Sequence, residues 1–170
     1  MFNLLDTVDM VTGTQRKDTL KGQSGADLIK GLGGDDTLIG NGGNDMLYGG
    51  LGKDVLTGGS GQDVFVFDTK PSGKANSDRL TDFDVKDDSI WLENKVFTKL
   101  GKAGSAAMPA QLSKSSFAID RAKDKNDYLI YNEKTGVLSY DADGSGSKSA
   151  IEIAQLKKGL GLSHKDFFVI

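Results

Sequence analysis

The sequence predicts an all-β fold, in which a right-handed parallel β-roll is followed by a β-rich, sandwich-like cap. Three features of the N-terminal part of the 170-residue chain predict the roll: an aspartate at every ninth position, glycines with the same step, and a large apolar residue two places after each aspartate. A period of nine fits neither the 3.6-residue repeat of a helix nor the alternation of a plain strand. Each repeat is therefore expected to be a tight turn followed by a very short strand.

The turn of each repeat is predicted from its glycines, because such turns need positive φ angles and bare backbone. These glycines are Gly22, Gly25, Gly31, Gly33, Gly34, Gly40, Gly42, Gly43, Gly49, Gly50, Gly52, Gly58 and Gly61. The three residues after each aspartate, such as Val55-Leu56-Thr57, are expected to form the strand and to point the middle side chain inward. Two repeats then make one coil.

The repeating aspartates are the candidate metal ligands. They are Asp18, Asp27, Asp36, Asp45, Asp54 and Asp63. Stacked coils bring each aspartate opposite the one two repeats further on, where the carboxylates repel each other. A hard divalent cation removes this repulsion, and calcium tolerates irregular coordination by flexible turns better than magnesium does. The sequence thus predicts several calcium ions between stacked turns. Solvated surface aspartates, the alternative, would not need strict nine-residue spacing.

The repeats resemble the nonapeptide Gly-Gly-x-Gly-x-Asp-x-U-x, with U a large apolar residue, of the repeats-in-toxin (RTX) family of calcium-binding proteins. Residues 49–57 and 58–66 match this pattern throughout. Three repeats replace the second glycine, with Gln23, Leu32 and Asn41. Asn41 is the mildest of these changes, because asparagine tolerates left-handed backbone.

The first unit departs furthest from the family pattern. Arg16 stands where the second of the fixed glycines belongs. An ion shared by Asp18 and Asp36 is therefore expected to bind more weakly than the others.

The resemblance implies a secreted, extracellular, non-enzymatic module that folds on calcium and supports type I secretion and the stability of an exported protein. Extracellular calcium modules have dissociation constants of roughly 10⁻⁴–10⁻³ M, so the roll is expected to stay unfolded in the cytosol. The type I secretion machinery is the implied partner. Family members carry an uncleaved C-terminal signal, and Asp166-Phe167-Phe168-Val169-Ile170 resembles its ending. A last β-strand of the cap is a compatible alternative interpretation of this segment.

Composition narrows the classes of function. A net charge of -3 disfavours nucleic acid as a partner. The chain has no cysteine, so neither disulfides nor thiolate zinc sites are available. No apolar run approaches the length of a membrane span, so no transmembrane segment is expected. The first ten residues lack the basic region of a secretory signal peptide.

The chain is divided into an N-terminal segment at 1–12, the roll at 13–67, and the cap with its secretion signal at 68–170. In the cap, a loop at 68–77 precedes short strand-like runs, and Asn132–Gly136 reads as a hairpin turn. The runs are 79–83, 89–92, 128–131, 137–140, 150–156 and 167–170.

One face of the roll is predicted to be covered. Its outward residues are Leu28, Lys30, Met46, Tyr48, Val64 and Val66, a stripe too apolar to leave in water. We expect the cap or the segment 2–11 to cover it. A surface for a partner protein is the alternative.

Two acidic clusters outside the repeats are further metal candidates. Asp141 and Asp143 begin a stretch with EF-hand spacing that ends at Glu152, but a strand instead of a helix is expected before it. A Gly/Ser-rich turn is the alternative there. The second cluster, Asp82, Asp84, Asp87 and Asp88, could lend a ligand to the end of the roll.

Little in the sequence supports catalysis. His164 is the only histidine, so no His-Glu-x-x-His zinc site exists, and it reads as a surface residue. The main alternative function is a polysaccharide- or surface-binding accessory module of a larger secreted enzyme or adhesin. Such a module needs a basic or aromatic groove, for which the scattered candidates are Lys21, Lys30, Tyr48 and Trp91.

Overall fold

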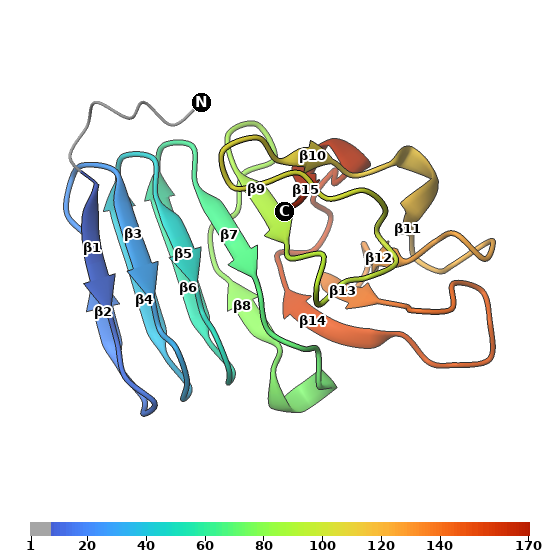
Figure 1. Ribbon diagram of the computed structural model, residues 1–170, viewed down its shortest axis with the longest axis horizontal. Helices are drawn as coiled ribbons and strands as arrows, with labels where there is room; N and C mark the ends of the chain where they lie inside the picture. Colours follow the sequence, from blue (N-terminus) through green and yellow to red (C-terminus); the bar gives the residue numbers. More distant parts are fainter. Residues whose placement is uncertain (1–7) are drawn as a thin grey trace.

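The computed structural model describes residues 8–170, which form two β-sheets with short 3₁₀ helices and no α-helix (Figure 1). Sheet A contains, in spatial order, β1 (Asp9–Thr12), β3 (Asp27–Lys30), β5 (Met46–Tyr48), β7 (Val64–Phe67), β9 (Ser89–Leu92), β15 (Phe167–Val169) and β10 (Ala110–Gln111). Sheet B contains β11 (Phe117–Ile119), β12 (Leu129–Tyr131), β13 (Val137–Tyr140), β14 (Ile151–Gln155), β8 (Asp78–Leu80), β6 (Val55–Ser60), β4 (Thr37–Gly42) and β2 (Thr19–Lys21). The 3₁₀ helices are η1 (Gly73–Ala75), η2 (Lys114–Ser116) and η3 (His164–Asp166). Over residues 8–170, no helix has the length and apolar character that crossing a membrane requires.

Strands β1 to β7 alternate between the two sheets, and successive coils follow one another along the long axis of the molecule (Figure 1). Each strand pairs in parallel with the strand two places further along the chain, as in Leu38 with Leu56 and Leu47 with Phe65. Equivalent residues of successive coils lie 18 positions apart. The structure thus confirms the all-β fold and the parallel β-roll.

The roll has a narrow core, because each strand points only its middle side chain inward. From β3 to β7 those side chains are completely buried: Ile29, Leu38, Leu47, Leu56 and Phe65. Burying one such residue contributes on the order of 2 kcal/mol. Ordering the roughly nine residues of a repeat costs about 1–2 kcal/mol each in backbone entropy alone. The apolar core therefore accounts for only part of the stability of a coil.

The first strand of the roll lies within the segment 1–12, which the sequence assigned to an N-terminal extension. Strand β1 pairs in parallel with β3, with Asp9 opposite Asp27 and Val11 opposite Ile29. Asp9 stands nine places before Asp18 and has an apolar residue two places after it, so it keeps the period of the repeats. No glycine precedes Gly13 in the sequence. A boundary drawn from the glycines therefore leaves this strand out.

The cap continues both sheets of the roll. Strands β8 and β9 pair in parallel with β6 and β7, and are followed in their sheets by β14 and β15. Each of the six strand-like runs of the cap overlaps a strand, and the turn at 132–136 joins the antiparallel strands β12 and β13. Strands β10 and β11 were missed, because two or three residues are too few to show an alternating pattern.

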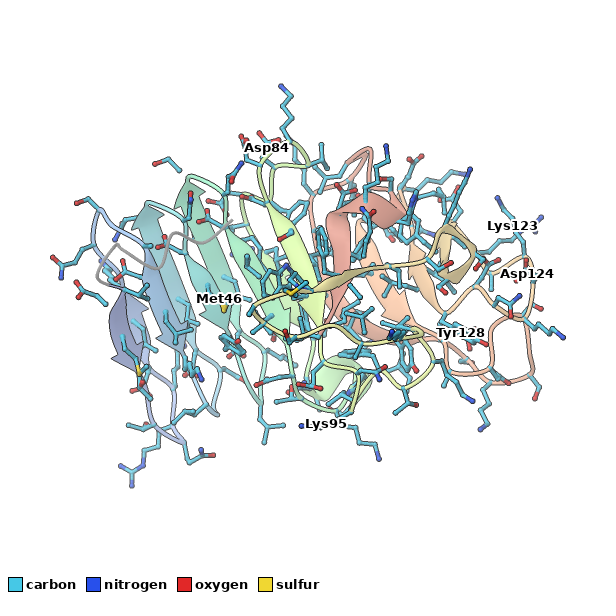
Figure 2. The ribbon with its side chains drawn as sticks, turned by 45° about the horizontal axis from the view of Figure 1, so that its top comes forward. Met46, Asp84, Lys95, Lys123, Asp124 and Tyr128 are labelled. Carbon is cyan, nitrogen blue, oxygen red and sulfur yellow. The ribbon has the colours of Figure 1, made fainter. Side chains whose placement is uncertain are left out.

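The outer face of sheet A is covered only near the cap. Val64 and Val66 are buried against Trp91, whereas Met46 and Tyr48 are half-buried at the edge of the same cluster (Figure 2). The prediction that the cap covers this face therefore holds for the last strand of the roll. The alternative cover was segment 2–11, of which residues 2–7 lie outside the described residues. The rest of this segment includes β1, whose Met10 is 69% exposed.

Candidate metal centre

The turns between the strands form two rows, each with one aspartate per coil. Each turn of the first row ends in an aspartate, namely Asp18, Asp36 or Asp54, and leads into a strand of sheet B. Each turn of the second row ends in Asp27, Asp45 or Asp63 and leads into a strand of sheet A. All but Asp18 are buried, with at most 1% of the side chain exposed. The short, uniform turns thus hold carboxylates inside the roll, where burial of an unpaired charge is costly.

In four of the five buried aspartates, one oxygen is bound by the preceding coil. The Asp27 N–H donates to Asp45 Oδ1 at 2.8 Å, and the Asp36 N–H donates to Asp54 Oδ1 at 2.8 Å. The Asp18 and Asp45 N–H groups donate in the same way to the aspartates 18 residues later. Each aspartate therefore faces the one two repeats further on, as the period predicts.

The second carboxylate oxygen divides the six aspartates into two groups. In four of them Oδ2 is buried and accepts no hydrogen bond from any described residue: Asp36, Asp45, Asp54 and Asp63. In the first two, Oδ2 accepts a backbone hydrogen bond, from the Thr14 N–H to Asp18 and from the Gln23 N–H to Asp27, both at 2.7 Å. An ionised oxygen without a donor is expensive to bury, so the first group needs a further partner.

The backbone of the turns explains this division. Before the four free oxygens, the second and fourth residues of the repeat have positive φ angles: Leu32, Gly34, Asn41, Gly43, Gly50, Gly52, Gly59 and Gly61. Gln23 and Gly25, at the same positions of the second repeat, do not. In that conformation the Gln23 N–H reaches Asp27 and occupies its oxygen. The left-handed turn is therefore the form that leaves the carboxylate free.

Burial and repulsion raise the pKa of these carboxyl groups. Burial raises the pKa of Asp45 to about 7, and the charges of Asp63 and Asp27 act in the same direction. Burial likewise raises the pKa of Asp54 to about 6, with Asp36 adding to the shift. A folded-state pKa above the unfolded value means that stability falls as pH rises from about 4 through the folded pKa. Without a cation, the ionised turns therefore oppose folding at neutral pH.

The first glycine of each repeat lies against Oδ2 of the aspartate of that repeat. A Cβ on Gly40 would collide with Asp45 Oδ2 and with the carbonyl oxygen of Gly58, and a Cβ on Gly31 would collide in the same way with Asp36 and Gly49. Carboxylate and carbonyl oxygens thus surround a space that only glycine leaves open. By contrast, a Cβ on Gly25 meets nothing within 4 Å.

These oxygens fit calcium. The donors that gather in the turns are carboxylate and peptide oxygens, which are the ligands of a hard divalent cation. No group of three or more His, Cys, Asp or Glu side chains among residues 8–170 could hold a metal ion. A cation in these turns must therefore take many of its ligands from peptide carbonyls. Asp36 with Asp54 and Asp45 with Asp63 are the two pairs in which both members have a free oxygen.

Comparison with protein families decides what the roll is. The family described as RTX calcium-binding nonapeptide repeat (4 copies) matches residues 12–47 and 31–65. The roll consists of RTX repeats. RTX repeats bind several calcium ions per repeat region, so calcium is the cofactor of this roll.

Solved structures extend the similarity to the cap. The chain is similar to the AlgE6R2 subunit of the mannuronan C5-epimerase of Azotobacter vinelandii, with 25% identity, a TM-score of 0.58, and coverage of 92% of this chain and 90% of that one. The AlgE6R3 subunit of the same epimerase is 23% identical over 96% of this chain and 81% of its own, with a TM-score of 0.50. A search of curated proteins gives no significant match.

The third similar structure shows the same fold inside a larger enzyme. Extracellular lipase LipA from Serratia marcescens is 20% identical, with a TM-score of 0.51. The match covers 95% of this chain but only 21% of the lipase. The roll is thus a calcium-binding RTX module, and the fold of roll and cap together recurs in parts of enzymes.

The EF-hand-like loop of the cap lacks its last predicted ligand. Asp141 is buried, and the Asp143 N–H donates to its Oδ1 at 3.2 Å, while Asp143 Oδ1 is buried without a donor among the described residues. Glu152 instead accepts a hydrogen bond from Ser77 Oγ at 2.8 Å, and strands β13 and β14 flank the loop. A calcium site at Asp141 and Asp143 stays a prediction, and Glu152 is not expected to be one of its ligands.

Three further aspartates continue the two rows, namely Asp9, Asp78 and Asp88. Sequence reasoning missed Asp9 and Asp78, and it named Asp88 only as one of four acidic residues that could lend a ligand to the end of the roll. Asp9 keeps the nine-residue step and only lacks a glycine turn before it. Asp78 and Asp88 each precede a strand with the order Asp-x-apolar, but lie 24 and 25 residues after the aspartates they face. The order Asp-x-apolar could have identified these aspartates. A search for strict nine-residue spacing passes over those that follow a longer connection.

Proposed function

We propose that this chain is a secreted, non-catalytic RTX module that folds when extracellular calcium fills its turns and thereby supports the secretion and stability of an exported protein. The observation that carries this proposal is the set of four buried carboxylate oxygens without donors, at Asp36, Asp45, Asp54 and Asp63. Burial without a counter-charge penalises the metal-free fold, and a bound cation removes the penalty. Binding free energy then becomes folding free energy.

The difference between cytosolic and extracellular calcium concentrations determines where the roll folds. Extracellular modules bind calcium with dissociation constants of roughly 10⁻⁴–10⁻³ M, far above cytosolic levels. The roll is then unfolded where the chain is made and folded where it is delivered. The similarity of the fold to extracellular lipase LipA supports an extracellular location.

The C-terminus fits export by a type I system in the unfolded state. The segment 166–170 includes strand β15, in which Phe167 and Val169 are buried and pair with β9. Once the protein folds, these apolar residues are hidden in sheet A. A secretion signal in this segment is therefore accessible to the machinery only before calcium folds the chain.

The pattern of contacts around the only histidine supports a non-catalytic role. Ser163 and Asp166 form a capping box at η3, in which the Ser163 N–H donates to Asp166 Oδ2 at 2.7 Å and Ser163 Oγ accepts from the Lys165 N–H at 3.2 Å. The hydroxyl and carboxylate beside His164 are thus used to begin a turn.

Far-ultraviolet circular dichroism during a calcium titration tests the folding switch, with magnesium as the control. We expect little β signal without metal, a cooperative gain at millimolar calcium, and no equivalent gain with magnesium. A chelated sample with the full β signal would contradict the proposal.

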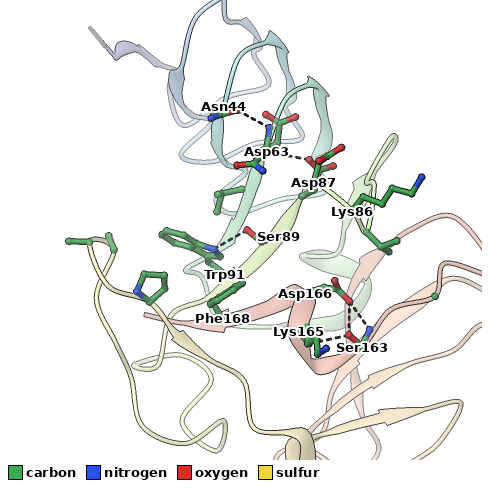
Figure 3. A pocket seen from close by; sticks show the side chains of 18 residues that line it. Asn44, Asp63, Lys86, Asp87, Ser89, Trp91, Ser163, Lys165, Asp166 and Phe168 are labelled. Carbon is green, nitrogen blue, oxygen red and sulfur yellow. Dashed lines mark hydrogen bonds between the residues drawn. The ribbon is translucent and has the colours of Figure 1, made fainter. Parts of the chain in front are cut away.

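A second candidate function is binding of a polysaccharide, favoured by the similarity to two subunits of a mannuronan C5-epimerase. A cavity of about 780 Å³ at the junction of roll and cap has Trp91 and Phe168 on its wall and Lys86 and Lys165 at its edge (Figure 3). Trp91 is only 7% exposed, so it offers little stacking surface.

A glycan array probed with the calcium-loaded protein separates the two functions. Retention of an anionic polysaccharide that is lost in Lys86→Ala/Lys165→Ala would support the second function. A calcium-folded protein that binds no glycan would leave the folding module as the function.

A further inference from the structure

The two rows of turns continue past the last RTX repeat. Strand β8 pairs in parallel with β6, with Leu80 opposite Leu56, and strand β9 pairs with β7, with Ile90 opposite Phe65. Leu80 and Ile90 are buried in the positions that inward residues of the repeats occupy. Each follows an aspartate by two places, so both strands keep the residue order of a repeat.

The aspartates before these strands make the same contact as those of the repeats. The Asp54 N–H donates to Asp78 Oδ1 at 3.1 Å across 24 residues, and the Asp63 N–H donates to Asp88 Oδ1 at 3.0 Å across 25 residues. Within the roll, the corresponding bonds span 18 residues. The longer connections loop outward, with Asp84 in the second of them (Figure 2), and return each carboxylate to the next place in its row.

The last two turns of the roll still hold free oxygens where these carboxylates arrive. Asp54 and Asp63 are 1% exposed, and their Oδ2 atoms accept no hydrogen bond from the described residues. Asp78, 4% exposed, brings a further buried carboxylate to the end of the first row. We propose that Asp78 with Asp54, and Asp88 with Asp63, form two additional calcium sites, one at the cap end of each row.

The cap satisfies the backbone of the last turns, and the Asp84 N–H donates to Asp88 Oδ2 at 2.8 Å, but no described residue donates to Oδ2 of Asp54 or Asp63. Asn76 Oδ1 accepts from the Gly52 N–H at 2.7 Å, and the carboxylate of Asp82 accepts from the N–H groups of Gly58 and Gly59 at 3.0 and 2.8 Å. These side-chain oxygens replace the carbonyls of a following turn. The carboxylate of Asp82 adds negative charge beside Asp63, which a cation offsets and a purely structural end of the roll does not.

The location of the two sites links calcium directly to the cap. Strand β8 lies between β6 and β14, and β9 lies between β7 and β15. A cation held by Asp78 or Asp88 therefore joins the last RTX turn to the strands on which the rest of each sheet is built. This inference rests on the proposed calcium-dependent function and adds sites outside the region that the family matches, which ends at residue 65.

Terbium luminescence reports on one of the two sites, because the chain has a single tryptophan. Trp91 lines the same cavity as Asp63, Asp87 and Asp88 (Figure 3). Tb³⁺ is bound by the same oxygen ligands as calcium, and excitation of a nearby tryptophan makes it emit. We expect wild-type protein loaded with Tb³⁺ to show emission on tryptophan excitation, and absence of that emission would overturn the Asp88 site.

Asparagine variants assign the sites residue by residue. Asp88→Asn keeps an oxygen that can accept from the Asp63 N–H but loses the charge, so we expect one calcium fewer by native mass spectrometry and loss of most tryptophan-sensitised emission. Asp78→Asn should also lose one calcium while keeping the emission. Asp87→Asn, on the wall of the same cavity but outside the row, is the matched control and should equal wild type.

The outcomes separate this inference from the proposed function. If both variants fold in calcium, by circular dichroism, and bind as many ions as wild type with unchanged emission, the two sites do not exist. If wild type gains no β signal in calcium, the proposed function fails first. A variant that does not fold at saturating calcium while Asp87→Asn does would show that the charge is needed at that position, which supports the proposal.

Discussion

At the scale of single residues, the second position of each repeat controls whether a carboxylate is free to bind a cation. Gln23 and Leu32 both replace the consensus glycine, yet only Leu32 adopts a positive φ, of 76°. Gln23 instead donates its N–H to Asp27. The sequence shows both substitutions as departures from the consensus. It could not tell them apart, because the φ angle of each turn also depends on the coil stacked against it.

Leu32→Gly is expected to strengthen the roll. A side chain at a left-handed position destabilises the fold by about 1–2 kcal/mol, and glycine removes this strain. Glycine also makes the unfolded chain more flexible, which offsets roughly 0.5–1 kcal/mol of the gain. Leu32 is 40% exposed, so little packing is lost. The calcium midpoint by circular dichroism should fall.

Asn41→Gly is the matched control for this change. Asparagine tolerates the left-handed conformation, and Asn41 Nδ2 donates to the Gly22 carbonyl at 2.8 Å. We expect an unchanged or higher midpoint for this variant. Leu32→Gly with a raised midpoint would show that strain at residue 32 is not limiting.

Asp45→Ala should reduce calcium affinity far more than Asp18→Ala. Asp45 has a free buried oxygen and faces aspartates on both sides, whereas both a backbone and a hydroxyl donor of Thr14 already bind Asp18 Oδ2. Isothermal titration calorimetry should show at least one calcium fewer for Asp45→Ala and a nearly normal count for Asp18→Ala. Equal losses in the two variants would contradict the grouping by free oxygens.

At the scale of elements, the turns and strands differ in how far the sequence predicts them. The roll strands and their 18-residue register follow from the period, because a fixed repeat leaves only one way to stack the inward side chains of β3 to β7. The cap strands β8 and β9 were found from composition, but their place in the rows was not. Their connections vary in length, and only tertiary structure shows where a loop returns.

Glycines of different turns should respond differently to substitution, according to what an added Cβ would meet. Gly40→Ala places a Cβ against Asp45 Oδ2 and the Gly58 carbonyl, where the cation would bind. We expect loss of calcium binding in the second row and destabilisation of roughly 2–4 kcal/mol, as for other sites where strain and overpacking coincide.

Gly25→Ala provides the internal comparison, because its Cβ meets nothing within 4 Å and its φ is not in the left-handed range. Its calcium midpoint should stay close to that of wild type, or improve slightly as the unfolded chain loses freedom. Similar midpoints for Gly25→Ala and Gly40→Ala would argue against a binding space beside Gly40.

At the scale of the whole molecule, the two sheets run without interruption from the roll into the cap. Phe65, Ile90 and Phe167 lie side by side in sheet A, and all belong to one apolar core. The roll and the cap therefore cannot separate without exposing that core. Composition alone suggested two regions, since the change after Phe67 is sharp, but packing unites them.

Calcium-induced folding is accordingly expected to be a single transition. Trp91 reports on the junction, where it packs with Val64, Val66 and Phe168, and circular dichroism reports on all the strands. The midpoints of the two signals in one calcium titration should coincide, and chelation should reverse both. A tryptophan emission spectrum that is already native-like in chelator would mean that the cap folds by itself.

The alternation of strands between the sheets also limits how such a protein can change in length. Removing one nonapeptide would move every strand on its N-terminal side into the opposite sheet, so that Leu28 and Lys30 would leave the face they share with Met46 and Tyr48. Removing two would restore the original sides. Evolution and protein engineering can therefore shorten or extend this roll by whole coils without breaking up its outer apolar stripe, whereas an odd number of repeats requires the exposed surface to be rebuilt.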